Sequence, residues 1–297
     1  MVLRPGRAPM GVSVERTAVG PTLIVAIDQY DERTLVPDPW AVRILPRRWR
    51  VPAVLSRFKV VRNAMIAATE NSVRGGWASL LCRKRYIDDV LAGAASGGGL
   101  DAVVILGAGY DTRAHRVLQL SDVPVWEVDL PDNIAAKTAA LQRCFGPMPA
   151  NVTPVSVDLE HGDLIGSLTG AGFDTGMRTA FVWESVTMYL TEPVVRRTLQ
   201  ATSACAAGSH LVFTHFRKDF VDGVSLYGAQ KARERFADKL HLWRYGIDPE
   251  DVAGVLAEYG WRETEQAGAS EYRKRYLAPA GRSDPLSEIE RAVWAQR

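Results

Sequence analysis

Short apolar runs rich in β-branched residues recur along the second two-thirds of the chain, separated by polar segments. The first run, Asp101 to Leu106, reads DAVVIL and stops at Gly107. A continuous apolar run of this length is typical of a strand buried on both faces of a parallel sheet. Further strands are predicted at Pro124 to Val128, Pro154 to Val157, Ala180 to Trp183 and His210 to Thr214.

Segments with helical periodicity alternate with these strands. The predicted helices are Arg113 to Leu120, Pro131 to Arg143, Glu192 to Ala207 and Pro249 to Tyr259. Alternating strands and helices predict a doubly wound, mostly parallel sheet, so the fold class is α/β. Beyond Trp261 the apolar and polar positions alternate, which predicts one or two closing strands.

The N-terminal third has a different character. From Thr22 to Leu91 the pattern is helical with breaks at prolines and glycines, and Trp77 to Ala92 forms a good amphipathic helix. Residues 1–17 look loosely held, and the glycine-rich run Ala92 to Gly99 looks like a flexible joint. We therefore expect a helical cap over residues 1–95 and a ligand-binding core over residues 96–297. The cap is expected to cover the carboxyl ends of the strands and to exclude water.

Composition excludes several classes of protein. The 297 residues carry 36 basic and 34 acidic side chains, which gives no case for a general nucleic-acid surface. The basic run from Arg43 to Arg50 is interpreted as a solvated turn. Three scattered cysteines, without metal-ligand spacing, argue against disulfides and against a metal site. No signal peptide or membrane-spanning run is seen, so we expect a cytoplasmic protein without a membrane partner.

Glycine and acidic residues follow the predicted strands in a regular order. Gly107 and Gly109 form a tight turn directly after the first strand, where a ligand can approach the backbone closely. Acidic residues then end the next three strands, and ligands of open α/β sheets bind at such carboxyl ends. The candidate binding residues at these ends are Glu127, Asp129, Asp158, Leu159 and Glu184.

The residues after the glycine turn bear on which nucleoside binds. A dinucleotide site prefers a third glycine where this chain has Thr112, and Asp111 would face the pyrophosphate. S-adenosylmethionine carries no phosphate, and its ammonium and sulfonium groups are attracted by carboxylates. At the strand ends, Glu127 or Asp129 could bind the ribose, and Asp158 with Leu159 could bind the adenine. The pattern therefore favours S-adenosylmethionine over NAD.

Longer motifs resemble a known family. The motifs are VVILGAGYDTRAHRV (Val103 to Val117), WEVDLPDNIAAK (Trp126 to Lys137), VDLE (Val157 to Glu160) and FVWESVTMYLTEPVV (Phe181 to Val195). They resemble the leucine carboxyl methyltransferase family, and most closely its actinobacterial branch of S-adenosylmethionine-dependent O-methyltransferases. DPWA and RKRYIDD upstream, and RKRYLAPAGRSDPLSEIERAV downstream, extend the resemblance to residues 20–295.

The resemblance implies a class I methyltransferase fold, with a Rossmann-like doubly wound sheet and a helical N-terminal cap. It also implies cofactor contacts from Arg85, Gly107, Asp129, Asp158, Leu159 and Glu184. Ser185 and Thr187 stand where this branch has small or aliphatic residues, so the acceptor of a relative does not carry over.

Three side chains are candidates for the methyl-transfer step. Arg85 could orient a carboxylate acceptor through two hydrogen bonds, and such an acceptor is ionised without a base. A hydroxyl acceptor would need a base, for which His215 is the best-placed candidate, and Tyr189 could line the acceptor pocket. We therefore expect methylation of a carboxylate or hydroxyl of a small molecule. A non-catalytic S-adenosylmethionine-binding protein and an NAD(P)-dependent oxidoreductase are the alternatives.

Overall fold

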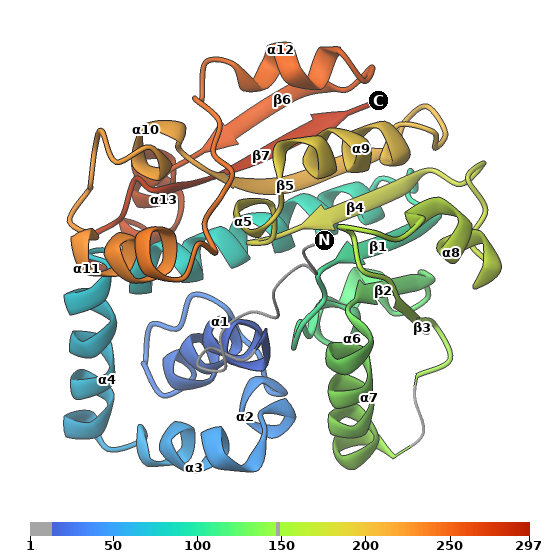
Figure 1. Cartoon of the computed structure of the whole chain (residues 1–297). Coiled ribbons are helices and arrows are strands. Elements are labelled where there is room, and N and C mark those ends of the chain that lie inside the picture. The colour runs from blue at the N-terminus through green and yellow to red at the C-terminus, as the bar shows by residue number, and fades with distance from the viewer. Residues whose placement is uncertain (1–13, 147–148) are drawn as a thin grey trace, which may run out of the picture.

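The computed structural model describes residues 14–146 and 149–297. Its centre is one seven-stranded sheet in the order β3-β2-β1-β4-β5-β7-β6 (Figure 1). The strands are β1 (Ala102–Leu106), β2 (Val125–Asp129), β3 (Val152–Ser156), β4 (Thr179–Trp183), β5 (His210–Phe216), β6 (Arg262–Ala267) and β7 (Glu290–Gln296).

The first five strands are parallel, and the sheet is doubly wound as predicted. β1 pairs with β2 on one side and with β4 on the other, so the strand order reverses at β1. The two closing strands are antiparallel, and β7 lies between β5 and β6. All five parallel strands predicted from the sequence are confirmed, and two closing strands are present.

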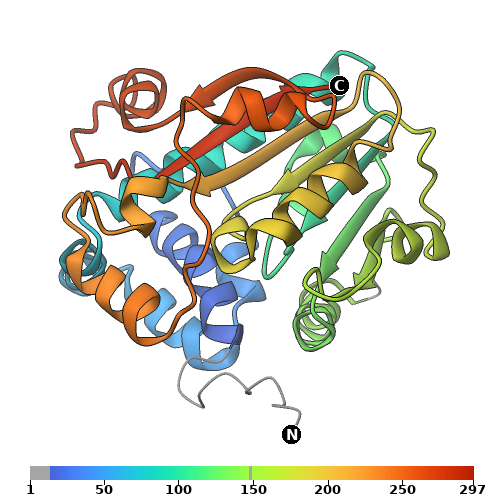
Figure 2. The same ribbon diagram turned by 45° about the horizontal axis from the view of Figure 1, so that its top comes forward.

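Helices cover both faces of the sheet (Figures 1 and 2). The α-helices are α1 (Val14–Asp28), α2 (Ala41–Ile44), α3 (Arg47–Leu55), α4 (Lys59–Ser72), α5 (Gly76–Ser96), α6 (Arg113–Arg116), α7 (Pro131–Phe145), α8 (Leu164–Gly170), α9 (Glu192–Thr202), α10 (Lys218–Val221), α11 (Gln230–Arg233), α12 (Val252–Ala257) and α13 (Ala269–Tyr272). Single turns of other helix types are η1 (Leu118–Leu120), η2 (Thr187–Tyr189), η3 (Glu234–Lys239) and η4 (Arg273–Leu277).

Alternating side chains of each strand divide the core into two layers. In β1, Val103 and Ile105 belong to the core layer between the sheet and helices α1, α2, α5 and α7. Val104 and Leu106 belong to the layer on the other face, with α8, α9 and α12. Because both faces are covered, β1 and β4 are buried along their whole length. This explains why their sequences are apolar throughout instead of alternating.

Some helix boundaries differ from the sequence prediction. Arg113 to Leu120 is divided into α6 and η1, and the helix predicted to Ala207 ends at Thr202. Helix α8 was not predicted, because its LIGSLTG segment contains two glycines. Its first turn is stabilised by the Asp163 carboxylate, which accepts a hydrogen bond from the backbone N–H of Gly166.

The long helix α5 packs against β4, β5 and β7, although the sequence placed it in the cap. Helices α1 to α4 lie to one side of the sheet, below it in Figure 1. Of the segment expected to be loosely held, residues 1–13 lie outside the described residues and Val14 begins α1. The division into a cap and a core at residue 95 remains a prediction.

The described residues form no cluster of three metal-binding side chains. The three cysteines, Cys82, Cys144 and Cys205, are all free. Searching the described residues for a helix both long and apolar enough to cross a membrane finds none.

Phe181 in β4 gives a test of the two-layer core, because its ring is fully buried and packs edge-on against Phe173. Phe181→Ala should lower the free energy of unfolding by about 3–5 kcal/mol, since it leaves a cavity between the sheet and α8. Leu118→Ala, at a side chain that is 83% exposed, should change it by less than about 0.5 kcal/mol. Urea unfolding measures both, and equal losses in the two variants would contradict the layered packing.

Candidate active site

A cavity of about 560 Å³ opens at the carboxyl ends of β1, β2, β3 and β4. It lies beside the strand at which the sheet order reverses, where ligands of doubly wound sheets bind. Pro21 and Thr22 of α1 and Leu80 of α5 contribute to its wall. The N-terminal helices are therefore part of this site, and the Thr22 hydroxyl donates a hydrogen bond to the carbonyl of Tyr110.

The glycine turn after β1 forms the floor of the cavity. Gly107 has a φ of 69° and Gly109 a φ of 41°, both in the region that favours glycine. A Cβ atom at Gly107 would come within 2.3 Å of Cγ2 of Val186, so no other residue fits there without a shift. The turn thus presents bare backbone to a ligand.

Asp129, at the end of β2, fastens this turn to the neighbouring strand. Its Oδ2 accepts a hydrogen bond of 2.7 Å from the backbone N–H of Gly109. Its Oδ1 accepts bonds of 2.7 Å from the N–H of Leu130 and from the side chain of Asn133 at the start of α7. The carboxylate is held in one orientation and lines the cavity.

Asp158 and Leu159 follow β3 and line another part of the cavity wall. The Asp158 carboxylate accepts a hydrogen bond of 2.9 Å from the N–H of Glu160, and its Oδ2 lies 3.0 Å from Nδ1 of His161. Asp158 is only half-buried, so it keeps access to solvent at this edge. At the same edge, Arg244 contacts Glu160 at 2.6 Å.

Glu184, at the end of β4, is the centre of a buried group of charges. Its carboxylate lies 2.9 Å from Nε of Arg83, 3.2 Å from Nζ of Lys84 and 2.7 Å from Nη1 of Arg113. Burial alone would raise the pKa of Glu184, but Lys84, Arg113 and Arg83 outweigh it and hold the pKa well below its usual range. Glu184 is therefore ionised at neutral pH.

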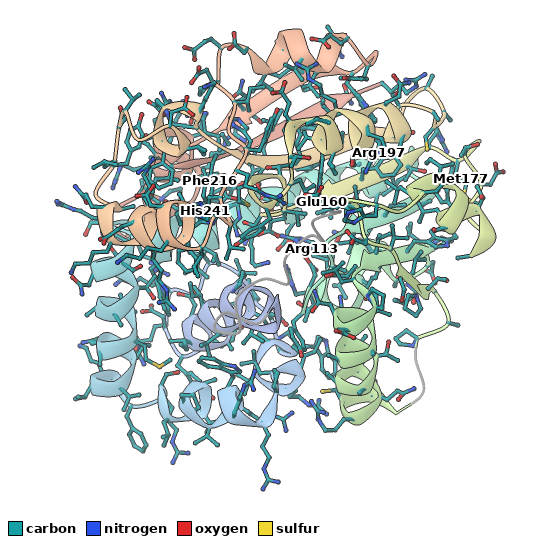
Figure 3. All side chains as sticks on the ribbon, in the orientation of Figure 1. Arg113, Glu160, Met177, Arg197, Phe216 and His241 are labelled. Carbon is teal, nitrogen blue, oxygen red and sulfur yellow. The ribbon has the colours of Figure 1, made fainter. Side chains whose placement is uncertain are left out.

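Arg113 joins the glycine turn to α5. Its guanidinium, which has no exposed surface, binds Asp111, Glu184 and Asp88. Burial disfavours this charge, but the three carboxylates keep the pKa of Arg113 well above its ordinary value. Asp88 also binds Arg116 at 2.6 Å. Figure 3 shows Arg113 between the sheet and the N-terminal helices.

A second group of polar contacts forms around Glu290 of β7. Its carboxylate binds Arg83 and accepts hydrogen bonds from the hydroxyls of Ser185 at 2.8 Å and Thr214 at 2.6 Å. Ser185 has a φ of 54°, which a non-glycine residue rarely adopts. Its N–H donates to the Thr214 hydroxyl at 2.7 Å, so hydrogen bonds on both sides stabilise the strained residue.

Seven of the residues predicted from the sequence line this one cavity. They are Gly107, Gly109, Asp129, Asp158, Leu159, Glu184 and Tyr189. Arg83, Lys84, Asp111, Ser185, Arg244 and Glu290 line it as well, and sequence reasoning did not select them as binding residues. Thr187, by contrast, is fully buried, and its hydroxyl donates to the carbonyl of Thr214.

The structure places Arg85 outside the cavity. Arg85 is nearly half exposed, pairs with Asp89 at 2.8 Å and does not line the cavity. Successive residues of an α-helix are about 100° apart, so Arg83 and Arg85 point in nearly opposite directions from α5. The helix phase places Arg83 and Lys84 against Glu184.

Glu127 does not reach the cavity either. It lies two residues deeper in β2 than Asp129, is almost fully buried and pairs with Lys137 at 2.8 Å. Lys137 lies 3.4 Å from the carbonyl of Ala108 and donates to it. This ion pair therefore lies under the glycine turn and stabilises it from below.

His215 cannot serve as the predicted base in this conformation. It is fully buried within β5, and its Nδ1 lies 3.0 Å from the carbonyl of Phe216. Burial lowers the pKa of His215 to about 4, so its ring is neutral at pH 7. Among the described residues, no histidine lines the cavity.

The Lys137–Glu127 pair gives a first test of the site. Lys137→Met should lower the free energy of unfolding by about 3–5 kcal/mol, because the Glu127 carboxylate stays buried without its cation. It should also weaken binding of S-adenosylhomocysteine through the glycine turn. The double variant with Glu127→Gln should recover most of the lost stability. Urea unfolding and calorimetry measure these effects, and equal losses in the single and double variants would contradict the pairing.

His215 gives a test through pH. The unfolded chain takes up a proton on this ring below a pKa of about 6.5, whereas the folded protein does so only near 4. The contribution of His215 to stability is therefore complete above pH 6.5 and is lost as the pH falls towards 4. His215→Leu should reduce the slope of unfolding free energy against pH by about 1.2 kcal/mol per pH unit between pH 5 and 6. An unchanged slope would show that the ring titrates normally.

Comparison with known proteins agrees with this geometry. The family model of leucine carboxyl methyltransferases matches residues 18–203. A Mycolicibacterium smegmatis protein named as an S-adenosyl-L-methionine-dependent methyltransferase is 29% identical over 282 residues, which are 92% of this chain and 88% of that protein. A protein of the same name from Mycobacterium marinum is 35% identical over 188 residues, 61% of each chain.

A solved structure shares the fold. The crystal structure of a methyltransferase-like protein from Thermobifida fusca covers 91% of this chain and 97% of its own, with a TM-score of 0.59 and 18% identity. This similarity supports the class I, Rossmann-like fold and says nothing of the acceptor. Together with the family match, it gives the assignment. The chain belongs to the leucine carboxyl methyltransferase family, as an S-adenosylmethionine-dependent methyltransferase.

Proposed function

We propose that this protein is an O-methyltransferase that acts on a carboxylate of a small molecule, or less favourably on a hydroxyl. The observation that carries the proposal is the chemistry of the cavity wall. Arg83 and Arg244 line the cavity with guanidinium groups that neighbouring carboxylates hold in place, and no histidine among the described residues offers a base. A carboxylate is already ionised near pH 7 and needs orientation but no deprotonation.

The cavity fits S-adenosylmethionine. The bare backbone at Gly107 and Gly109 accommodates a close ligand, and Asp129 and Asp158 present carboxylates to the ribose and the adenine amino group. Near the turn, Lys84 can bind the cofactor carboxylate, while Asp111 and Glu184 face its cationic groups. When bound, the cofactor supplies an electrophilic methyl group.

The protein's own contribution is position and electrostatics. Arg83 lies between Glu184 and Glu290, on the side of the cavity that Ser185 and Tyr189 also line. Its Nη2 group makes no hydrogen bond to any described residue, so it remains able to bind an acceptor carboxylate. The buried carboxylates fix the guanidinium in place before the acceptor arrives, which lowers the entropy cost of orientation. In this proposal Arg83 takes the role that was expected of Arg85.

The two alternatives are less favoured. Burial would raise the pKa of Asp111, but Arg113 and Lys84 lower it to about 2, so a negative charge faces the place of a pyrophosphate. This disfavours NAD(P). A protein that only binds the cofactor would have no use for the polar wall of Ser185, Tyr189 and Glu290.

Transfer of labelled methyl groups to a panel of small carboxylic acids, phenols and alcohols tests the proposal. We expect label on carboxylic acids and its release as methanol in mild alkali, because methyl esters hydrolyse there whereas methyl ethers do not. Alkali-stable label would assign a hydroxyl acceptor instead. If calorimetry detects cofactor binding and no panel member is labelled, the non-catalytic alternative gains support.

Two neighbouring variants separate the proposed roles on α5. Arg83→Met should reduce kcat/KM for the acceptor by at least about a hundredfold, since it removes a charged hydrogen-bond donor. Lys84→Met should mainly weaken S-adenosylhomocysteine binding. Arg85→Met is the matched control and should leave both values unchanged. Melting temperatures identify unfolded variants, and an Arg85→Met effect as large as that of Arg83→Met would contradict the assignment.

A further inference from the structure

An exposed apolar corner stands out at the junction of α3 and α4. Five side chains here are exposed: Val51 (58%), Val54 (37%), Leu55 (44%), Phe58 (53%) and Val60 (81%). Only two other large apolar side chains of the described residues, Leu118 and Val224, are comparably exposed, and each lies elsewhere. Isolated exposed side chains need no explanation, but a local group of five indicates an interaction surface.

Three of the five side chains lie on one side of α3, and Phe58 and Val60 lie at the start of α4. Val51, Val54 and Leu55 are three and four positions apart in α3, so they share a face, and Arg47 lies one turn earlier on it. Ala53, on the other side of α3, is fully buried. α4 continues from this corner and has no buried side chain at all. In Figure 1, α3 lies at the edge of the molecule farthest from β6.

The same segment is strongly basic. Between Asp38 and Glu70 there is no acidic residue, and the basic residues there are Arg43, Arg47, Arg48, Arg50, Arg57, Lys59 and Arg62. Since the whole chain has a net charge of only +2, the rest of it is net acidic. We call the five apolar side chains together with these basic residues the α3–α4 surface.

Five of the basic side chains of this surface form no ion pair with a carboxylate among the described residues. Arg50 donates to the carbonyl of Arg43 at 2.6 Å, and Arg62 to that of Ser56 at 3.3 Å. Within residues 14–146 and 149–297, none of Arg47, Arg50, Arg57, Lys59 and Arg62 pairs with a carboxylate. Elsewhere in the described protein, exposed pairs such as Arg196–Glu192 and Arg178–Asp101 are common.

We propose that the α3–α4 surface docks the protein on a bilayer that contains anionic phospholipid. Apolar side chains flanked by arginine and lysine suit the boundary between headgroups and acyl chains, where both kinds of contact are favourable. The contact is peripheral. Arg43 to Arg50 was interpreted as a solvated turn, but Arg47–Leu55 forms the helix α3. The expectation of no membrane partner rested on the lack of a membrane-spanning run, which a peripheral contact does not require.

Two other occupants fit the surface less well. Nucleic acid would use the basic side chains but would leave Leu55, Phe58 and Val60 without apolar contacts. In a symmetric dimer through this face, each basic surface would meet its own copy, and the like charges would repel. A negatively charged bilayer satisfies both the cations and the apolar side chains.

The α3–α4 surface is connected to the cavity through the chain. α4 leads through the turn at Gly75 and Gly76 directly into α5, whose Leu80, Arg83 and Lys84 line the cavity. The inference about the surface does not depend on the acceptor proposed above.

Co-sedimentation of the full chain with vesicles tests the proposal. The protein should bind vesicles of phosphatidylcholine with phosphatidylserine and should not bind vesicles of phosphatidylcholine alone. The triple variant Arg47→Gln, Arg57→Gln, Lys59→Gln should weaken binding on the order of a hundredfold at low salt. The triple variant Leu55→Ser, Phe58→Ser, Val60→Ser should remove the part of the binding that persists at high salt.

Matched variants on other faces serve as controls. Arg262→Gln, Arg273→Gln, Lys274→Gln removes the same charge elsewhere, and Leu118→Ser, Val224→Ser removes exposed apolar side chains elsewhere. Both controls should bind vesicles as the parent protein does. All variants should keep the melting temperature and the S-adenosylhomocysteine affinity of the parent, because none of these residues lines the cavity.

Several results would overturn the proposal. One is no binding to phosphatidylserine vesicles, and another is an equal loss in the control variants. Binding to duplex DNA that the apolar variant retains in full, without vesicle binding, would assign the surface to nucleic acid. A dimer in sedimentation velocity that the apolar variant abolishes, again without vesicle binding, would assign it to a second copy of the chain.

Discussion

The fully buried guanidinium of Arg113 is the interaction on which the rest of the site depends. It binds Asp111 of the glycine turn, Asp88 of α5 and Glu184 of β4, so one cation joins three elements. A buried charge is tolerated only when it is well paired, and removal of one partner of such a pair typically costs about 3–5 kcal/mol. The network therefore holds the turn, the helix and the strand end in a single arrangement.

The site is built from both parts of the chain. The sheet supplies Asp129, Asp158 and Glu184 at its strand ends, and α5 supplies Arg83 and Lys84. The Glu184 carboxylate pairs with Arg83 and Lys84 of α5 and with Arg113. The N-terminal helices therefore contribute charged side chains to the cavity. They set the charge of the catalytic cavity, and their outer side carries the α3–α4 surface.

The strand ends could be predicted from the sequence because parallel strands are continuous apolar runs and their ends are marked by glycine or acid. The side of α5 that faces the sheet could not be predicted, because three basic residues follow one another and any of them could point inward. Only the packing of the helix shows that Arg83 does so. Glu127 was assigned to the cavity because it is on the same face of β2 as Asp129. Strand alternation predicts the face of a side chain but not its distance from the end of the strand. Glu290 was missed because it is 105 residues from Ser185 in the sequence. Nothing in the residues around an acid in a closing strand indicates a contact so distant along the chain.

The insertion of β7 between β5 and β6 has a consequence for synthesis at the ribosome. The cavity residues up to Glu184 belong to strands and helices that precede β5 in the chain, and these can associate while later segments are still being translated. The wall that includes Glu290 needs a contact with Arg83 across 207 residues, and contacts so distant in sequence form late. A nascent chain can thus assemble the glycine turn and the first strand ends well before Glu290 completes the opposite wall of the cavity.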